Sequence, residues 1–155
     1  MQGWSEVWPT RARILLATFW AGSLWTVGYL VAPTLFATLS DRVLTGTIAA
    51  SLFRAQAWVS VCCALFLVAM LPRRKEQANL PGNKALLGLI IAMLVCAVVI
   101  HFGLQPFMAS LREAAGSSGV MNSDQRAQFG ILHGISSVIY LIESVLALFL
   151  VLKIR

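Results

Sequence analysis

A stretch of 27 residues without a charged side chain, 85-ALLGLIIAMLVCAVVIHFGLQPFMASL-111, decides the fold class of this chain. A helix needs about 20 mostly apolar residues to cross the hydrocarbon core of a bilayer, and this stretch exceeds that length. Inside lipid the backbone has no water to bond, so a spanning segment is either a helix or a strand of a closed barrel. Barrel strands alternate apolar and polar residues, whereas this run is continuously apolar. The stretch therefore predicts a transmembrane helix.

Three further runs have the same character. Residues 14–36 and 55–72 carry no charge, and residues 127–152 are interrupted only by Glu143. The four runs predict an all-α polytopic membrane protein, with four transmembrane helices in a bundle of two hairpins. The chain is one domain, residues 1–155, and the expected spans are residues 13–37, 48–72, 84–107 and 128–153.

The composition excludes a soluble fold and a nucleic-acid partner. Apolar residues make up 59% of the chain and charged residues 12%, about half the usual charged share of a soluble domain. A small soluble domain could not bury that much apolar surface. The net charge is +6, but lysine and arginine lie at the ends of the spans rather than along one face. This pattern anchors helices in a membrane, so the expected partner is the lipid bilayer.

The positive side chains indicate the orientation. Eight fall on the side of the termini and of the loop between spans two and three: Arg11, Arg13, Arg73, Arg74, Lys75, Lys84, Lys153 and Arg155. Four fall on the other side: Arg42, Arg54, Arg112 and Arg126. Because positive residues favour the cytoplasmic side, we expect both termini in the cytoplasm. Trp4 and Trp8 are then expected at the inner interface.

The first apolar run is expected to stay in the mature protein. No small-x-small cleavage site follows it, so we expect it to be a retained span rather than a signal peptide.

The three cysteines, Cys62, Cys63 and Cys96, all lie inside apolar runs without metal-ligand spacing. We interpret them as small packing residues.

The chain also resembles two copies of one hairpin. The matches are, at a shift of 73, Arg11 with Lys84 and Pro33 with Pro106, and, at a shift of 83, residues 40–41 with 123–124 and residues 64–68 with 147–151. One insertion near residues 116–119 reconciles the two shifts. Apolar segments match easily by chance, so duplication and coincidence both stay open. A true duplication would be a parallel repeat.

Helix ends and helix contacts leave their own signals. Ser40 and Ser123 each precede an aspartate and are predicted to be N-caps. Helices two and four would then run for about 31 residues, or roughly 46 Å. Because the bilayer core is about 30 Å thick, the bundle should protrude on the outer side. Small residues that suit close helix contacts in lipid are Gly22, Ser23, Gly28, Gly130 and Gly134.

His101, His133 and Arg54 are predicted to lie at one depth. Each is 17 to 20 residues from the nearest cytoplasmic lysine or arginine, which places all three roughly 25–30 Å up, near the outer interface. Two imidazoles and a guanidinium at one level are what a bis-histidine haem b, or a small copper site, would need. The simpler interpretation is that the histidines bond backbone or water and hold no cofactor.

Glu143 is predicted near the middle of the bilayer, ten residues before Lys153. Helical spacing places it on a face with Ser136 and Tyr140, beside a stripe that includes His133, Ser137 and Ser144. An unpaired carboxylate at this depth costs several kcal/mol, so we expect it to be protonated or bonded to a facing hydroxyl. The candidate partners are Ser23, Thr26 and Ser60. Glu143 then serves either as a proton-relay or substrate contact, or as a hydrogen bond between helices.

Three segments resemble a known family: 20-WAGSLWTVGYLVAPTLF-36, 49-AASLFR-54 and 132-LHGISS-137. The combination of Gly-x-x-Trp-x-x-Gly with Leu-His-Gly-x-Ser-Ser is similar to the bacterial family of the domain of unknown function 4149, also called transmembrane-protein-205-like. The resemblance extends along essentially the whole chain, although Ala50 stands where a glycine is expected. It implies a multi-pass protein of the bacterial inner membrane.

The resemblance also implies two activities. The family is grouped loosely with CopD-like copper-resistance proteins and a haem-binding protoporphyrinogen oxidase of the HemJ type, which implies a metal or haem role for His133. Eukaryotic relatives are associated with resistance to drugs and metal compounds, which implies export or trafficking.

The motifs favour a protein that is not an enzyme. The sequence contains no nucleophile–base pair, no glycine-rich phosphate loop and no large soluble domain. We therefore expect a membrane protein that binds a partner or a small ligand in its outer half. The alternatives are a haem- or copper-handling protein and a small exporter of lipophilic or cationic compounds. Because four spans form a single bundle core, export would require a homo-oligomer.

Overall fold

The computed structural model describes residues 4–71, 80–116 and 119–154, and side chains from residue 10 onward. This part of the chain contains helices and no strand, which confirms the all-α class. The elements in order are α1 (Trp4–Trp25), η1 (Thr26–Val31), α2 (Ala32–Thr38), α3 (Arg42–Ala69), α5 (Pro81–Val98), η2 (Val99–Leu104), α6 (Gln105–Ala114) and α7 (Ser123–Lys153).

Four helices are long and apolar enough to cross a membrane, as predicted. They are Thr10–Thr38, Arg42–Ala69, Pro81–Ala114 and Ser123–Lys153. The second and fourth have 28 and 31 residues, against 31 predicted for each. All four extend beyond the predicted spans at the end of the bundle opposite the termini. At 1.5 Å per residue, α7 is about 46 Å long.

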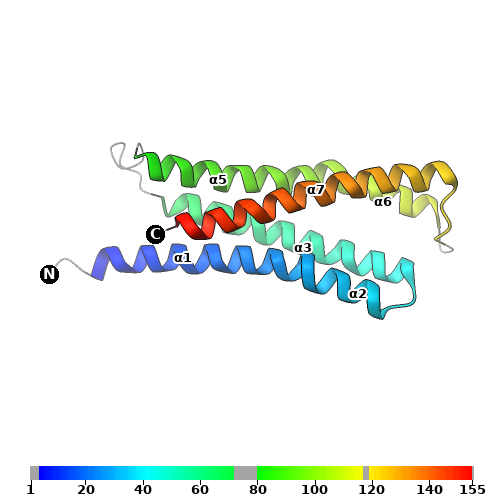
Figure 1. The fold of residues 1–155 in the computed structure, drawn as a ribbon, viewed down its shortest axis with the longest axis horizontal. Coiled ribbons are helices and arrows are strands. Elements are labelled where there is room, and N and C mark those ends of the chain that lie inside the picture. Colours follow the sequence, from blue (N-terminus) through cyan, green and yellow to red (C-terminus); the bar gives the residue numbers. More distant parts are fainter. Residues whose placement is uncertain (1–3, 72–79, 117–118, 155) are drawn as a thin grey trace.

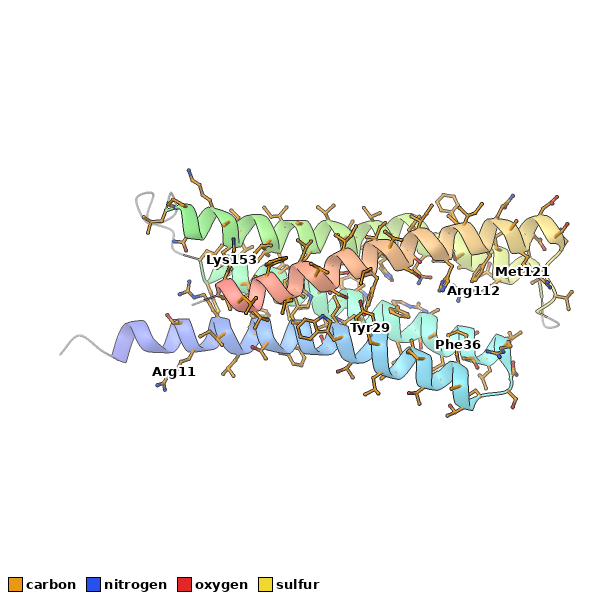
Figure 2. The ribbon with its side chains drawn as sticks, in the orientation of Figure 1. Arg11, Tyr29, Phe36, Arg112, Met121 and Lys153 are labelled. Carbon is orange, nitrogen blue, oxygen red and sulfur yellow. The ribbon has the colours of Figure 1, made fainter. Side chains whose placement is uncertain are left out.

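The helices form an up-and-down bundle (Figure 1). The span that begins with α1 packs against α3 and α7, and α5 also packs against α3 and α7, so the four form a closed ring. Arg11 and Lys153 lie at one end, while Arg112 and Met121 lie at the other (Figure 2). Both termini are therefore at the same end, as the hairpin arrangement requires.

The bundle is apolar on its outside, and several polar residues are buried within its otherwise apolar core. Large apolar side chains face outward, including Phe19, which is 59% exposed, and Trp58, which is 57% exposed. The buried polar residues are Thr45, Gln56, Ser60, Ser136, Glu143 and Ser144. This distribution is stable only where the surrounding solvent is itself apolar. The chain is thus a multi-pass membrane protein.

The helix starts differ by one residue from the prediction. Asp41 caps α3, because its carboxylate accepts N–H bonds from Val43 at 2.9 Å and Leu44 at 3.0 Å. Asn122 caps α7 in a capping box with Gln125, in which each side chain bonds the other's backbone. The prediction that Ser40 and Ser123 are the N-caps was therefore wrong. The Asp41 carboxylate accepts two N–H bonds at once, and the capping box of Asn122 and Gln125 also satisfies two N–H groups. A single serine hydroxyl satisfies fewer.

Two spans are interrupted by a π-helical turn at corresponding places. In η1 the N–H of Ala32 bonds the carbonyl of Val27, and in η2 the N–H of Gln105 bonds the carbonyl of Ile100. Each donor directly precedes a proline, Pro33 or Pro106, which lacks an N–H and disturbs the regular helix. The two π segments are 73 residues apart, which is the shift that aligns the prolines. This coincidence supports the duplication of the hairpin.

The small residues play fewer structural roles than predicted. A Cβ on Gly28 would meet the ring of Tyr140, so this glycine does serve a close helix contact. A Cβ on Gly22, Gly130 or Gly134 would meet nothing within 4 Å, so these glycines serve no close contact with the described residues. Among the cysteines, Cys63 lies in the core, Cys62 is exposed and Cys96 is half-buried, and all three are free.

Candidate functional site

A polar recess lies between α3, the η2 region and α7. Its volume is about 330 Å³, including space open to the outside, and it has room for about one water-sized group. The recess is lined by Phe53, Gln56, Ala57 and Ser60 of α3, Ala97, Ile100, His101 and Gln105 of the third span, and Tyr140 and Glu143 of α7. We call these residues the polar recess.

Glu143 is the only acidic residue among them. Its side chain is 2% exposed, and its Oε1 atom has no hydrogen-bond partner in the described part of the chain. A buried acceptor without a donor costs about 1–3 kcal/mol, so such groups are rare in native proteins. No hydroxyl of the described residues bonds this oxygen, so of the two predicted states the hydroxyl-bonded one is not observed and the protonated one stays a prediction. The hydroxyls of Ser23 and Ser60 have other partners.

Those hydroxyls join α1 to α3 instead. The indole N–H of Trp20 donates to Ser60 Oγ at 2.9 Å, and the side-chain amide of Gln56 donates to Ser23 Oγ at 3.2 Å. The Ser23 hydroxyl itself donates to the backbone carbonyl of Trp20 at 2.9 Å. The bonds of Trp20 to Ser60 and of Gln56 to Ser23 hold the α3 wall of the recess in place. The amide oxygen of Gln56 has no donor among the described residues.

Tyr140 is held tightly one turn before Glu143. Its hydroxyl donates to the carbonyl of Leu24 at 2.7 Å, and its ring meets Phe53 edge to face at 5.4 Å. Close by, the Tyr29 hydroxyl donates to Ser144 Oγ at 2.9 Å, and Figure 2 shows Tyr29 between the first span and α7. These bonds fix the rotation of α7, and so the direction in which Glu143 points.

A second hollow adjoins the polar recess on the outer surface of the bundle. Its volume is about 210 Å³, and apart from His101 its lining is apolar: Ala57, Trp58, Val61, Ala97, Val98 and Phe102. Trp58 and Phe102 are more than half exposed, so this lipid-facing groove opens toward the bilayer. Ala57, Ala97 and His101 line both hollows. The groove and the recess are therefore neighbours, with His101 between them.

A family model matches residues 15–117, about two thirds of the chain, with the description "Domain of unknown function (DUF4149)". The chain belongs to the DUF4149 family. The match ends before α7, so Tyr140, Glu143 and the Leu-His-Gly-x-Ser-Ser motif lie outside it, although the resemblance was expected along essentially the whole chain. No curated protein and no solved structure matches this DUF4149 chain.

The two histidines that were predicted to form a pair have different surroundings in this DUF4149 protein. His101 lines the recess, but His133 is exposed and stacks on Phe129 of its own helix, with ring centroids 6.1 Å apart. Arg54 is also exposed and does not line the recess. The described residues contain no group of three or more His, Cys, Asp or Glu side chains placed to hold a metal ion. A haem or copper site on both histidines therefore stays a prediction.

The serines predicted to accompany Glu143 bond within their own helix. The hydroxyls of Ser136 and Ser137 both donate to the carbonyl of His133 at 2.8 Å, and Ser144 donates to the carbonyl of Tyr140 at 2.9 Å. None of these serines lines the recess. Of the face predicted on α7, only Tyr140 and Glu143 do.

Two glutamines of the recess were not predicted to belong to a site. Gln56 and Gln105 are uncharged polar residues inside apolar runs, and that signal could have marked them. Arg112 positions Gln105, because its guanidinium donates to Gln105 Oε1 at 3.3 Å and to the carbonyl of Gly46 at 3.1 Å. Arg112 also lies over the ring of Phe129, at 5.8 Å. It thereby joins α3, α6 and α7 near the end of the bundle opposite the termini (Figure 2).

Proposed function

We propose that this DUF4149 protein binds a small amphipathic ligand, with the polar head in the polar recess and the apolar chain in the lipid-facing groove. The observation that carries the proposal is the carboxyl group of Glu143, which is 2% exposed and has an unpartnered Oε1 atom. A ligand that donates a hydrogen bond to this oxygen would remove its desolvation cost.

A purely structural role for Glu143 explains less. A carboxyl group that ties helices together must bond a donor on a neighbouring helix. Glu143 has no such bond to any described residue, whereas Tyr29, Trp20 and Gln56 all bond across helices. The bundle is therefore held by other side chains, and Glu143 is left free to contact a ligand.

The two hollows together have the character of a ligand site. Such sites are mostly apolar and carry a few polar groups that orient the ligand. Here the apolar part opens toward lipid beside Trp58 and Phe102, and the polar part is sheltered between helices. A ligand would therefore reach the recess from within the bilayer. Binding is what the recess supports, and export would in addition require a homo-oligomer or a partner protein.

Binding can be measured with two radiolabelled probes, dodecanol and dodecylamine. The protein is placed in nanodiscs of phosphatidylcholine, and the ligand bound in excess of protein-free nanodiscs is recorded. We expect saturable binding of at least one probe at about one ligand per chain. If neither probe shows a saturable excess, the proposed function is wrong.

A matched pair of variants locates the bound probe. Ala57 lines both hollows, so Ala57→Phe should fill them and abolish binding. Ala55 is on the same helix, is exposed and lines neither hollow, so Ala55→Phe should bind as the wild type does. Equal binding by both variants would place the ligand elsewhere on the protein.

We also propose the setting of this site. The excess of lysine and arginine on the side of the termini favours a bacterial inner-membrane location with both termini in the cytoplasm. On that orientation the recess lies between mid-bilayer and the outer leaflet, which agrees with the expectation of a ligand in the outer half.

A further inference from the structure

The polar recess contains several acceptors that receive no hydrogen bond. The Glu143 carboxyl and the Gln56 amide oxygen receive no hydrogen bond from any described residue, and the same holds for the imidazole of His101. Two of the donors beside them are committed, because Tyr140 donates to Leu24 and the amide of Gln56 to Ser23. A head group with several donors of its own therefore suits this recess.

Charge leads to the same conclusion. No described cationic side chain bonds Glu143, since Arg112 bonds Gly46 and Gln105, and Arg54 is exposed. A carboxylate held in an apolar region without a cation is strongly disfavoured, and a bonded cation removes most of that cost. A positive group supplied from outside the chain would bond the Glu143 carboxylate and remove most of that cost.

The size of the recess restricts the shape of that group. The recess has room for about one group of the size of water. A primary ammonium group is of that size and carries three N–H donors. A quaternary ammonium group is larger and has no N–H, so it cannot bond the acceptors.

We infer that the ligand of the polar recess is a lipophilic primary amine, bound as the ammonium ion against Glu143, with its alkyl chain along Trp58 and Phe102 in the lipid-facing groove. This inference rests on the proposed function and names its ligand class. The rings of Tyr140 and Phe53 line the same recess and add a surface that favours a cation.

A series of three dodecyl compounds tests the head group in the same nanodiscs. Dodecylamine should bind at least about tenfold more tightly than dodecanol, which corresponds to about 1.4 kcal/mol. Dodecyltrimethylammonium, which has the same chain and charge but a larger head, should bind no better than dodecanol. Glu143→Gln should remove the advantage of the amine and leave dodecanol binding unchanged. Glu113→Gln removes an exposed carboxylate at the outer end, so binding of all three probes should be as in the wild type.

The outcomes separate the two proposals. Saturable dodecanol binding with no preference for the amine, or a preference that survives Glu143→Gln, would overturn the ammonium assignment and leave the proposed function intact. Equal preference for the quaternary compound would show that charge alone acts, without the donor geometry, and would also overturn it. Displacement of dodecylamine by sodium chloride but not by choline chloride would assign the recess to an inorganic cation instead.

Discussion

Glu143 is the residue at which stability and function oppose each other most clearly. Its carboxyl group is buried with an unpartnered oxygen, while Trp20 and Tyr140, packed in the same bundle, have their polar atoms satisfied. Binding sites often keep groups that destabilise the protein, because the ligand needs them. The cost of Glu143 in the absence of a ligand should therefore be measurable.

Replacing Glu143 with methionine, a side chain of similar volume, removes the unpaired carboxyl. We expect Glu143→Met to raise the free energy of unfolding by about 1–3 kcal/mol, seen as a higher midpoint of thermal unfolding in nanodiscs. The same variant should lose the preference for dodecylamine. Glu113→Met, at an exposed carboxylate, should leave the midpoint nearly unchanged. A lower midpoint for Glu143→Met would mean that the carboxyl has a structural partner after all.

Gly28 gives a second prediction at the scale of one residue. A Cβ at this position would lie 2.9 Å from Tyr140 Cζ, closer than real side chains approach. Because Tyr140 is also held by its bond to Leu24, it cannot move aside cheaply. We expect Gly28→Ala to lower the free energy of unfolding by about 1–3 kcal/mol. Gly22→Ala, in the same span and facing open space, should be neutral or stabilising.

Among the elements, the spans were predictable and their irregularities were not. Each long uncharged run marks where a helix crosses the membrane, because charge is excluded from the bilayer core. Whether a π segment forms depends on how the chain accommodates Pro33 or Pro106. A kink, a water molecule or a partner helix can accommodate a proline as well. The sequence therefore showed the prolines and their shift of 73, but not the wide turns before them. The observed N-caps differ from the predicted ones by one residue for a similar reason, since Asp41 and Asn122 compete with the adjacent serines.

The matched prolines provide an experiment at the scale of the element. An alanine at either position restores an N–H, which favours a regular helix in place of the π turn. Losing the extra residue of a π turn rotates the neighbouring side chains by about 100°. The η2 turn carries Ile100 and His101 of the recess, whereas no residue of η1 lines it. Pro106→Ala should therefore weaken dodecylamine binding by about tenfold or more. Pro33→Ala acts on the recess only through contacts of η1 with α7, such as the bond of Tyr29 to Ser144, so it should weaken binding less. Both variants are measured in nanodiscs. Equal losses would show that the η2 turn has no special role.

For the whole molecule, the sequence predicted the bundle but only part of its site. Glu143 and His101 stood out because polar residues in apolar runs are rare. Their shared recess depends on α3, the η2 region and α7 meeting, and depth alone could not tell that His101 lies with Glu143 while His133 is exposed. Depth is one coordinate of a side chain in a membrane, and the rotation of its helix is the other. That rotation is set here by bonds such as Tyr29 to Ser144, which link residues 115 apart in the chain.

The orientation of the bundle gives the last prediction. The termini share one end with Gly82, at the start of α5, while Ser40 and Ser123 lie at the opposite end (Figure 1). Eight lysines and arginines against four predict that the first end lies in the cytoplasm. We expect a charged maleimide, which cannot cross the bilayer, to label Gly82→Cys only in inside-out vesicles and Ser40→Cys and Ser123→Cys only in intact spheroplasts. The native cysteines lie within spans, where this reagent does not reach, so wild-type protein serves as the unlabelled control. The reverse pattern would invert the orientation, and labelling of Ser40→Cys and Ser123→Cys from different sides would contradict the bundle itself.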